Sequence, residues 1–181
     1  MTRATSIRRR ARAVDAGARD PRGLTLRAAG LGLAGGMRAM APAAMLALSH
    51  ADAPPSALWA RWPVLRSAWG RRILVLVGAG ELVADKLPGT PSRLEPPALI
   101  GRVVIVTFGA AAIGSEYGGK GRTVWAAVVG AAAALAGNVL FARARAQGVA
   151  QTRLPDTAVA AIEDAACVGI LTAVARTRPP G

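Results

Sequence analysis

Seven charged residues lie inside or at the edges of long apolar segments of this 181-residue chain. A single charge near the centre of a lipid bilayer costs about 2.5–3.5 kcal/mol, so seven unpaired charges would together cost about 20 kcal/mol. These charges must therefore pair with one another, line a wet cavity, or reach water at the membrane surface. The seven residues are Arg38, Glu81, Asp85, Lys86, Arg102, Glu163 and Asp164.

The composition indicates an integral membrane protein. Only 18% of the residues are charged, against about 25% in a typical soluble domain. A net charge of +13 would suggest nucleic-acid binding in a soluble protein, but eight of the 23 basic residues precede residue 28 and most others lie between apolar segments. Basic residues that flank apolar segments are typical of a cytoplasmic-membrane protein. We therefore expect the lipid bilayer as the partner, and no specific nucleic acid.

Five apolar segments predict an all-α, polytopic bundle of four or five transmembrane helices. They cover residues 24–49, about 66 or 73–87, 98–114, 123–142 and 157–175. In the first segment, Gly35 and Gly36 are followed by Pro42, so this helix is expected to break between Gly35 and Pro42. In the fourth segment, small residues predict a face for close helix contact; they are Gly130, Ala134 and Gly137. Residues 52–63 predict an interfacial loop with Trp59 and Trp62 as aromatic anchors.

The charge distribution predicts the domain boundaries and the topology. Residues 1–23 are expected to form a disordered basic cytoplasmic tail, residues 24–176 one transmembrane domain, and residues 177–181 a short C-terminal tail. The basic tail favours a cytoplasmic N-terminus in a bacterial cytoplasmic membrane. If the first segment is a re-entrant hairpin broken at Arg38, the four later spans invert and both termini lie inside.

The pair Glu81 and Asp85 could carry chemistry. Residues four apart stack on one face of a helix, with Cβ atoms about 5–6 Å apart. Two carboxylates this close in a low-dielectric site cannot both ionise cheaply, so one holds a proton or a cation lies between them. The alternative is that Lys86, Arg38 or Arg102 neutralises them, in which case the charges fix the helix register.

Glu163 and Asp164 form a second acidic pair, with side chains about 100° apart around a helix. One can face the bundle while the other faces a neighbouring basic group. The count of three positive against four negative intramembrane charges is close to balance, which favours ion pairing.

Two function classes follow. The first is a small proton- or cation-linked transporter or channel-like protein, in which the acidic residues bind the proton, cation or small solute and a homodimer encloses the path. The second is a non-transporting membrane protein that organises lipid or a partner complex, with its charges as ion pairs. One histidine, one cysteine and no nucleotide or nucleophile motif argue against an enzyme, a cofactor or a metal site.

Several short motifs follow one another in a recognisable order. They are Gly36-Met37-Arg38-Ala39-Met40-Ala41-Pro42, Glu81-Leu82-Val83-Ala84-Asp85-Lys86-Leu87-Pro88, Pro91-Ser92-Arg93, Arg102 and Glu163-Asp164. This order resembles a bacterial membrane protein family catalogued as domain of unknown function 4126. The resemblance covers roughly residues 28–175 and implies an all-helical integral membrane protein, with no assigned activity.

Overall fold

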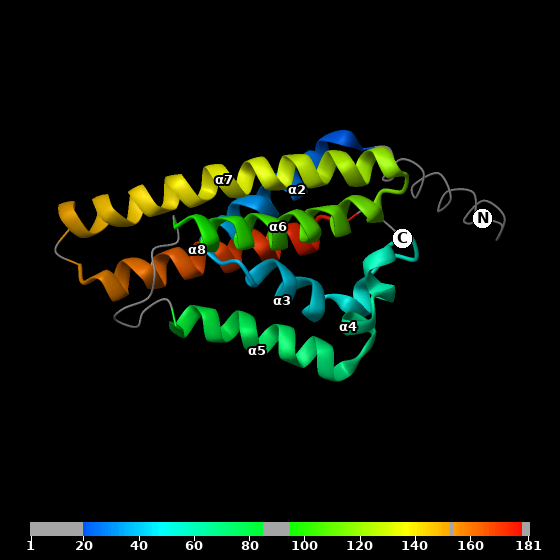
Figure 1. The fold of residues 1–181 in the computed structure, drawn as a ribbon, viewed down its shortest axis with the longest axis horizontal. Coiled ribbons are helices and arrows are strands. Elements are labelled where there is room, and N and C mark those ends of the chain that lie inside the picture. Colours follow the sequence, from blue (N-terminus) through cyan, green and yellow to red (C-terminus); the bar gives the residue numbers. More distant parts are fainter. Residues whose placement is uncertain (1–19, 85–94, 153, 179–181) are drawn as a thin grey trace, which may run out of the picture.

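The computed structural model describes residues 20–84, 95–152 and 154–178, and these residues form helices joined by short turns, with no strand among them (Figure 1). The expected all-α class is therefore confirmed. The α-helices are α2 (Pro21–Met37), α3 (Ala41–Leu48), α4 (Pro63–Arg66), α5 (Ala68–Ala84), α6 (Pro96–Glu116), α7 (Lys120–Gln151) and α8 (Asp156–Arg176). Two short 3-10 helices, η1 (His50–Asp52) and η2 (Leu58–Arg61), lie between α3 and α4.

The first apolar segment folds back on itself. Helix α2 ends at Met37, Arg38 adopts an extended backbone conformation, and α3 begins at Ala41, with Pro42 in its first turn. Figure 1 shows that α3 then runs back toward the end of the bundle from which α2 started. The helix thus breaks in the interval where the glycines and the proline predict a break, and α2 and α3 form a hairpin.

The remaining long helices run alternately between the two ends of the bundle (Figure 1). We call the end that holds Glu116 the Glu116 end, and the opposite end, where α7 meets α8, the Arg145 end. Helix α5 runs from the Glu116 end to the Arg145 end, α6 returns, α7 runs out again, and α8 returns. The start of α2 and the end of α8 therefore meet at the Glu116 end, where the Arg27 side chain donates a hydrogen bond to the Val174 carbonyl at 3.0 Å.

Helices α2 and α7 pack closely because both present small residues at their contact. Gly32 and Gly36 of α2 lie against Gly130, Ala134 and Gly137 of α7, and all five residues are buried. In lipid, where apolar burial does not drive helix association, such close backbone approach supplies the packing energy. The small-residue face expected in the fourth segment lies at this contact.

Substituting Gly36 by alanine is expected to lower the free energy of unfolding by about 1–3 kcal/mol, the usual cost of overpacking. An added Cβ would lie 2.8 Å from the Asn138 backbone nitrogen and 2.9 Å from the Ala134 carbonyl oxygen, and a helix backbone cannot move aside cheaply. Circular dichroism during thermal unfolding in detergent measures the effect. The matched control is Gly101→Ala in α6, where nothing lies within 4 Å of an added Cβ. Equal stability of the two variants would contradict the close α2–α7 contact.

The structure differs from the expected elements in two places. Helix α2 begins at Pro21, ahead of the expected start at residue 24, because Asp20 caps it by accepting hydrogen bonds from the amides of Arg22 and Gly23. Helix α7 continues to Gln151, nine residues past the end of the fourth apolar segment at residue 142. Alanine, arginine and glutamine in this stretch are strong helix formers.

The expected number of spans is a separate matter. Among the described residues, α6, α7 and α8 are long and apolar enough to cross a membrane. Helices α2 and α5 each have 17 described residues, a rise of about 26 Å against a hydrocarbon core of about 30 Å. Length and composition therefore do not confirm the expected count of four to five. The expected tails, 1–23 and 177–181, lie largely outside the described residues.

Candidate functional site

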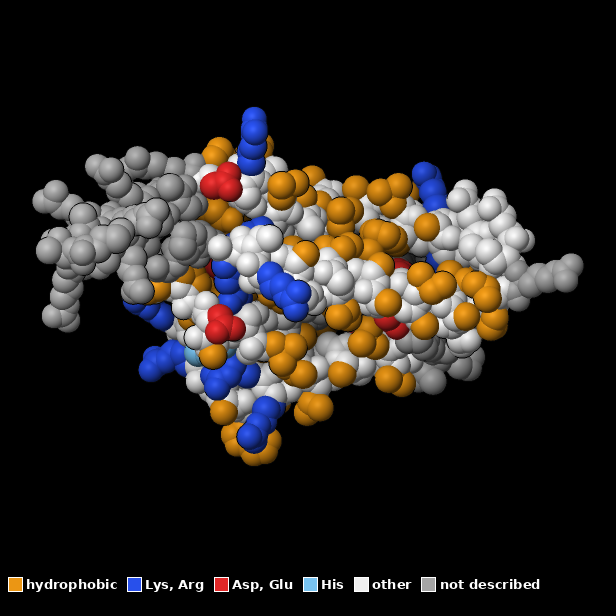
Figure 2. Space-filling view, turned by 180° about the vertical axis from the view of Figure 1, so that it is seen from behind, with side chains coloured by type: hydrophobic (Ala, Val, Ile, Leu, Met, Phe, Trp, Pro, Cys, Tyr) orange, Lys and Arg blue, Asp and Glu red, His pale blue; other side chains and the backbone are white. Residues whose placement is uncertain are grey.

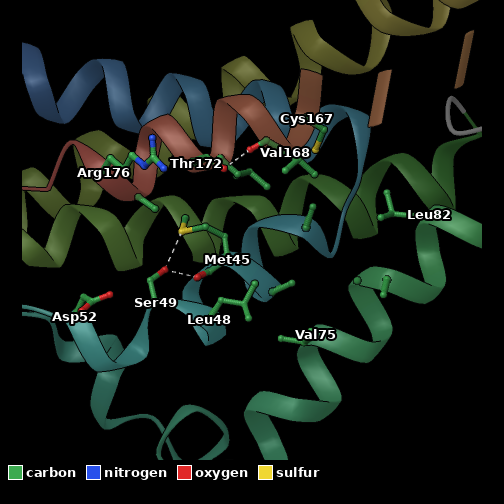
Figure 3. Close-up of a pocket in the computed structure, with 16 residues that line it drawn as sticks. Met45, Leu48, Ser49, Asp52, Val75, Leu82, Cys167, Val168, Thr172 and Arg176 are labelled. Carbon is green, nitrogen blue, oxygen red and sulfur yellow. Dashed lines mark hydrogen bonds between the residues drawn. The ribbon is translucent and has the colours of Figure 1, made fainter. Parts of the chain in front are cut away.

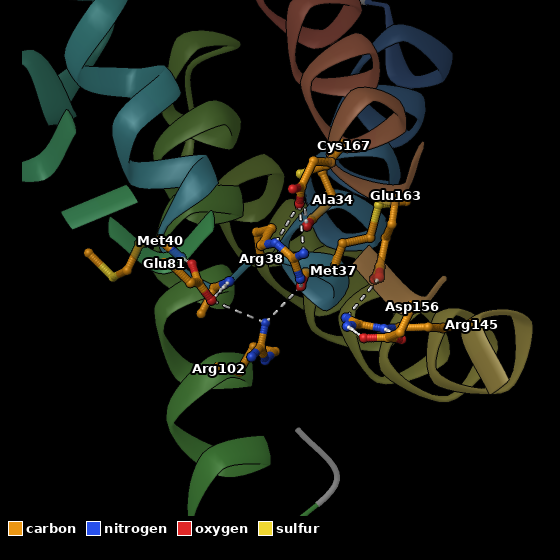
Figure 4. A network of polar contacts seen from close by, with 12 residues as sticks. Ala34, Met37, Arg38, Met40, Glu81, Arg102, Arg145, Asp156, Glu163 and Cys167 are labelled. Carbon is orange, nitrogen blue, oxygen red and sulfur yellow. Dashed lines mark hydrogen bonds and ion pairs between the residues drawn. The ribbon is translucent and has the colours of Figure 1, made fainter. Parts of the chain in front are cut away.

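The break between α2 and α3 exposes backbone groups that need hydrogen-bond partners. At the start of α3, the Glu81 carboxylate accepts hydrogen bonds from the backbone amides of Ala39 and Met40, both at 2.8 Å (Figure 4). Glu81 comes from α5, so a side chain of one helix caps the N-terminus of another. A carboxylate at this position also interacts favourably with the positive end of the helix dipole.

The last carbonyl of α2 is satisfied by cations. The Met37 carbonyl oxygen accepts hydrogen bonds from Arg38 at 3.0 Å and from Arg102 of α6 at 3.2 Å. Arg102 also lies 3.5 Å from the Glu81 carboxylate, so it bridges the two sides of the break. Positive charge near a helix C-terminus is favourable for the same dipolar reason.

Arg38 also connects the break to α8. Its guanidinium Nε donates to Asp164 at 2.8 Å, and its Nη2 lies 2.6 Å from the same carboxylate oxygen. Arg38 is fully buried and the Asp164 side chain is 15% exposed. Each charge thus loses most of its hydration and is compensated by the other.

Glu163, the neighbour of Asp164, faces a different cation. Its carboxylate lies 3.8 Å from Arg145 of α7, and Arg145 also makes a bidentate pair with Asp156 at 2.9 and 2.7 Å. Asp156 is the first residue of α8, so these contacts join the end of α7 to the start of α8 (Figure 4). The two adjacent carboxylates therefore lie against separate arginines, as their angular separation around the helix allows.

Five of the seven sequence-predicted site residues are thus close to the break or to the α7–α8 junction. Arg38, Glu81, Arg102 and Asp164 surround the break, and Glu163 lies at the junction. Asp85 and Lys86 lie outside the described residues. Within the described part of the chain, no three histidine, cysteine or acidic side chains are placed to hold a metal ion.

A second buried charge cluster lies at the Glu116 end, and the sequence analysis missed it. The Glu116 carboxylate lies 2.6 Å from Arg27 of α2 and 3.8 Å from Arg178, and it accepts a hydrogen bond from the indole of Trp59 at 3.1 Å. Burial lowers the pKa of the Arg178 guanidinium, while the Glu116 carboxylate raises it. Glu116 thus joins the ends of α2, α6 and α8 to the connection between α3 and α4.

Two signals in the sequence point to this cluster. Arg27 lies inside the first apolar segment, and Glu116 follows the third apolar segment by two residues. In the structure α6 continues to Glu116, and the turn follows at Gly118 and Gly119, both with positive φ. The interpretation of Trp59 as an interfacial anchor is wrong, because it is fully buried against Glu116.

Comparison with known proteins identifies a family model that matches this chain. The family model described as "Domain of unknown function (DUF4126)" matches residues 25–178. This match extends the expected range of 28–175 by three residues at each end. Neither the curated proteins nor the solved structures contain a match to this chain. Since the match covers most of the chain, including both charge clusters, the protein belongs to the DUF4126 family.

Proposed function

We propose that this chain is a non-catalytic, non-transporting membrane protein that organises lipid or a partner complex, with its intramembrane charges serving to hold a re-entrant hairpin. One observation carries the proposal: the break uses these charges to satisfy its own backbone. Glu81 accepts hydrogen bonds from the two backbone amides just before α3, and Arg38 and Arg102 donate to the last carbonyl of α2. Non-helical backbone at membrane depth is tolerated only where protein or a wet cavity satisfies it.

The proposed topology has four crossings and one hairpin. Helices α5 to α8 cross the membrane, α2 and α3 enter and leave on one side, and both termini lie on the cytoplasmic side of a bacterial cytoplasmic membrane. Ten of the described lysines and arginines belong to the Glu116 end, and four to the break or the Arg145 end. Figure 2 shows basic side chains gathered toward the end where the described chain begins. The positive-inside rule therefore favours a cytoplasmic Glu116 end.

Proton- or cation-linked transport is the second candidate. It is favoured by the side chains of Glu81 and Asp164, which are 19% and 15% exposed beside two helix ends. Half-helix ends that meet within the membrane form the substrate and ion sites of many secondary transporters. In this chain the N-terminus of α3 already holds the Glu81 carboxylate, which occupies the position that an anionic substrate would take.

Carbodiimide labelling against pH separates the two candidates, because a hydrophobic carbodiimide modifies protonated carboxyls in apolar surroundings. We expect no labelling of Glu81, Glu163 or Asp164 at neutral pH in lipid, since each carboxylate lies against an arginine or accepts hydrogen bonds from backbone amides. Labelling is expected after denaturation. Mass spectrometry of peptides from the purified protein locates the modified residues.

The control for reagent access is Asp20, an exposed carboxylate that a water-soluble carbodiimide should label in the folded protein. The contrary result is labelling of Glu81 or Asp164 near neutral pH that an added cation prevents. That result would replace the proposed role with a titratable transport site.

A further inference from the structure

A groove of about 450 Å³ lies between α5 and α8, with α3 as its floor (Figure 3). Its walls are almost entirely apolar, with Met45, Val75, Leu82 and Leu171 among the lining side chains. Met45 and Leu171 are buried, whereas Leu48, which also lines the groove, is 73% exposed. The groove is therefore open along one side, where a membrane would place lipid chains.

The length of the groove matches one leaflet of a bilayer. Along α8 it runs from Cys167 to Arg176, ten residues, and the helical rise between these two residues is about 14 Å. Half of a hydrocarbon core of about 30 Å is about 15 Å. Because Arg176 is the last residue of α8, the groove begins at the Glu116 end and stops near the middle of the membrane.

The charged residues that line this groove lie at one end of it. Ser49, Asp52 and Arg176 lie at the Glu116 end, opposite Leu82 (Figure 3). Asp52 and Arg176 are exposed, and neither side chain makes an ion pair or hydrogen bond within the described part of the chain. An acid and a base thus lie at the mouth of an apolar channel, and the charged group that acts on Asp52 is the Arg178 guanidinium, which forms no ion pair or hydrogen bond with it.

We propose that the groove binds one glycerophospholipid whose headgroup carries a phosphate and a primary ammonium. An acyl chain lies between α5 and α8, Arg176 binds the phosphate, and Asp52 accepts hydrogen bonds from the ammonium. A primary ammonium fits better than a quaternary one because it has N–H donors for a carboxylate. An acidic headgroup without an amine would leave Asp52 unpaired. This proposal rests on the proposed lipid-organising function and names its ligand.

Native mass spectrometry of the purified protein, titrated in detergent with phosphatidylethanolamine, phosphatidylcholine or phosphatidylglycerol, tests the site. We expect one phosphatidylethanolamine molecule to be retained in preference to the other two lipids. Asp52→Asn should remove the preference over phosphatidylcholine. Arg176→Gln should weaken binding of all three lipids about tenfold, the loss expected for one charge-assisted hydrogen bond.

A variant that fills the groove provides a test independent of the headgroup. Ala79 of α5 lines the groove, so Ala79→Trp should abolish retention of the lipid. The matched control, Ala132→Trp, changes an exposed residue of α7, which contributes nothing to the groove, and should bind normally. Thermal unfolding of each variant shows whether it is folded.

Three results would overturn the proposal. Equal retention of all three lipids by the wild-type protein and Asp52→Asn would mean non-specific lipid only. Normal binding by a folded Ala79→Trp would place the lipid elsewhere. Cross-linking between cysteines introduced at Leu48 of two copies, with no lipid retained, would mean that a second copy covers the groove. Carbodiimide labelling reports on Glu81, Glu163 and Asp164, none of which lines the groove. The proposed function can therefore fail while the lipid site stands, and the lipid site can fail while the proposed function stands.

Discussion

Glu116→Gln is expected to destabilise the protein more than any other single carboxylate substitution, by about 3–5 kcal/mol, the usual cost of breaking a buried ion pair. The carboxylate lies against Arg27 and Arg178 and accepts a hydrogen bond from the Trp59 indole N–H. Removing its charge leaves two largely buried guanidiniums without an anion at this end of the bundle. Unfolding in detergent, followed by circular dichroism, measures the loss.

Asp20→Asn is the matched control, since it removes one negative charge from the same end. Asp20 is exposed and caps α2, and asparagine caps helices as well as aspartate does. This variant should stay within about 0.5 kcal/mol of the parent protein, as exposed substitutions usually do. A Glu116→Gln protein as stable as Asp20→Asn would mean that the cluster at the Glu116 end contributes little to folding.

Local patterns in the sequence predict local features of the fold. The glycines before Pro42 predict the break because small residues and a missing amide weaken a helix wherever it lies. The face of Gly130, Ala134 and Gly137 predicts a close contact because three- and four-residue spacings share one side of a helix. The cost of burying isolated charges likewise predicts that Arg38 and Asp164 need compensation, and they lie together at 2.6 Å.

Local patterns do not predict features that depend on contacts between residues far apart in the sequence. Nothing near Arg38 specifies that α3 turns back, because Glu81, 43 residues later, caps the returning helix. Glu116 has the composition of a turn around it, and its burial depends on Arg27, Trp59 and Arg178 from three other segments. The extension of α7 past residue 142 places Arg145 against Asp156, a contact that exists only once α8 has packed beside it.

The Arg38→Met variant is expected to lose about 3–5 kcal/mol of stability, because it leaves the mostly buried Asp164 carboxylate without a guanidinium at 2.6 Å. The double variant Arg38→Met/Asp164→Leu should be more stable than Arg38→Met by about 1–3 kcal/mol, because replacing both members of a buried ion pair by apolar residues costs less than removing one. Recovery is expected to be partial, since the Met37 carbonyl also loses the hydrogen bond from Arg38. The free energies of unfolding of the parent protein, the two single variants and the double variant, measured in the same detergent, complete this double-mutant cycle.

Arg143→Met controls for loss of a positive charge in the same region, because Arg143 is exposed on α7 and should be replaceable at little cost. A structural pair and a transport site give opposite patterns in this cycle. If Arg38 and Asp164 hold the hairpin, the single variants unfold early and removing both restores part of the stability. If Asp164 instead exchanges protons or cations, the Arg38→Met and Asp164→Leu variants should be close to the parent in stability while protein-dependent flux in vesicles disappears. Single variants with the stability of the parent protein, together with measurable flux through the parent protein, would therefore assign these charges to a transport site.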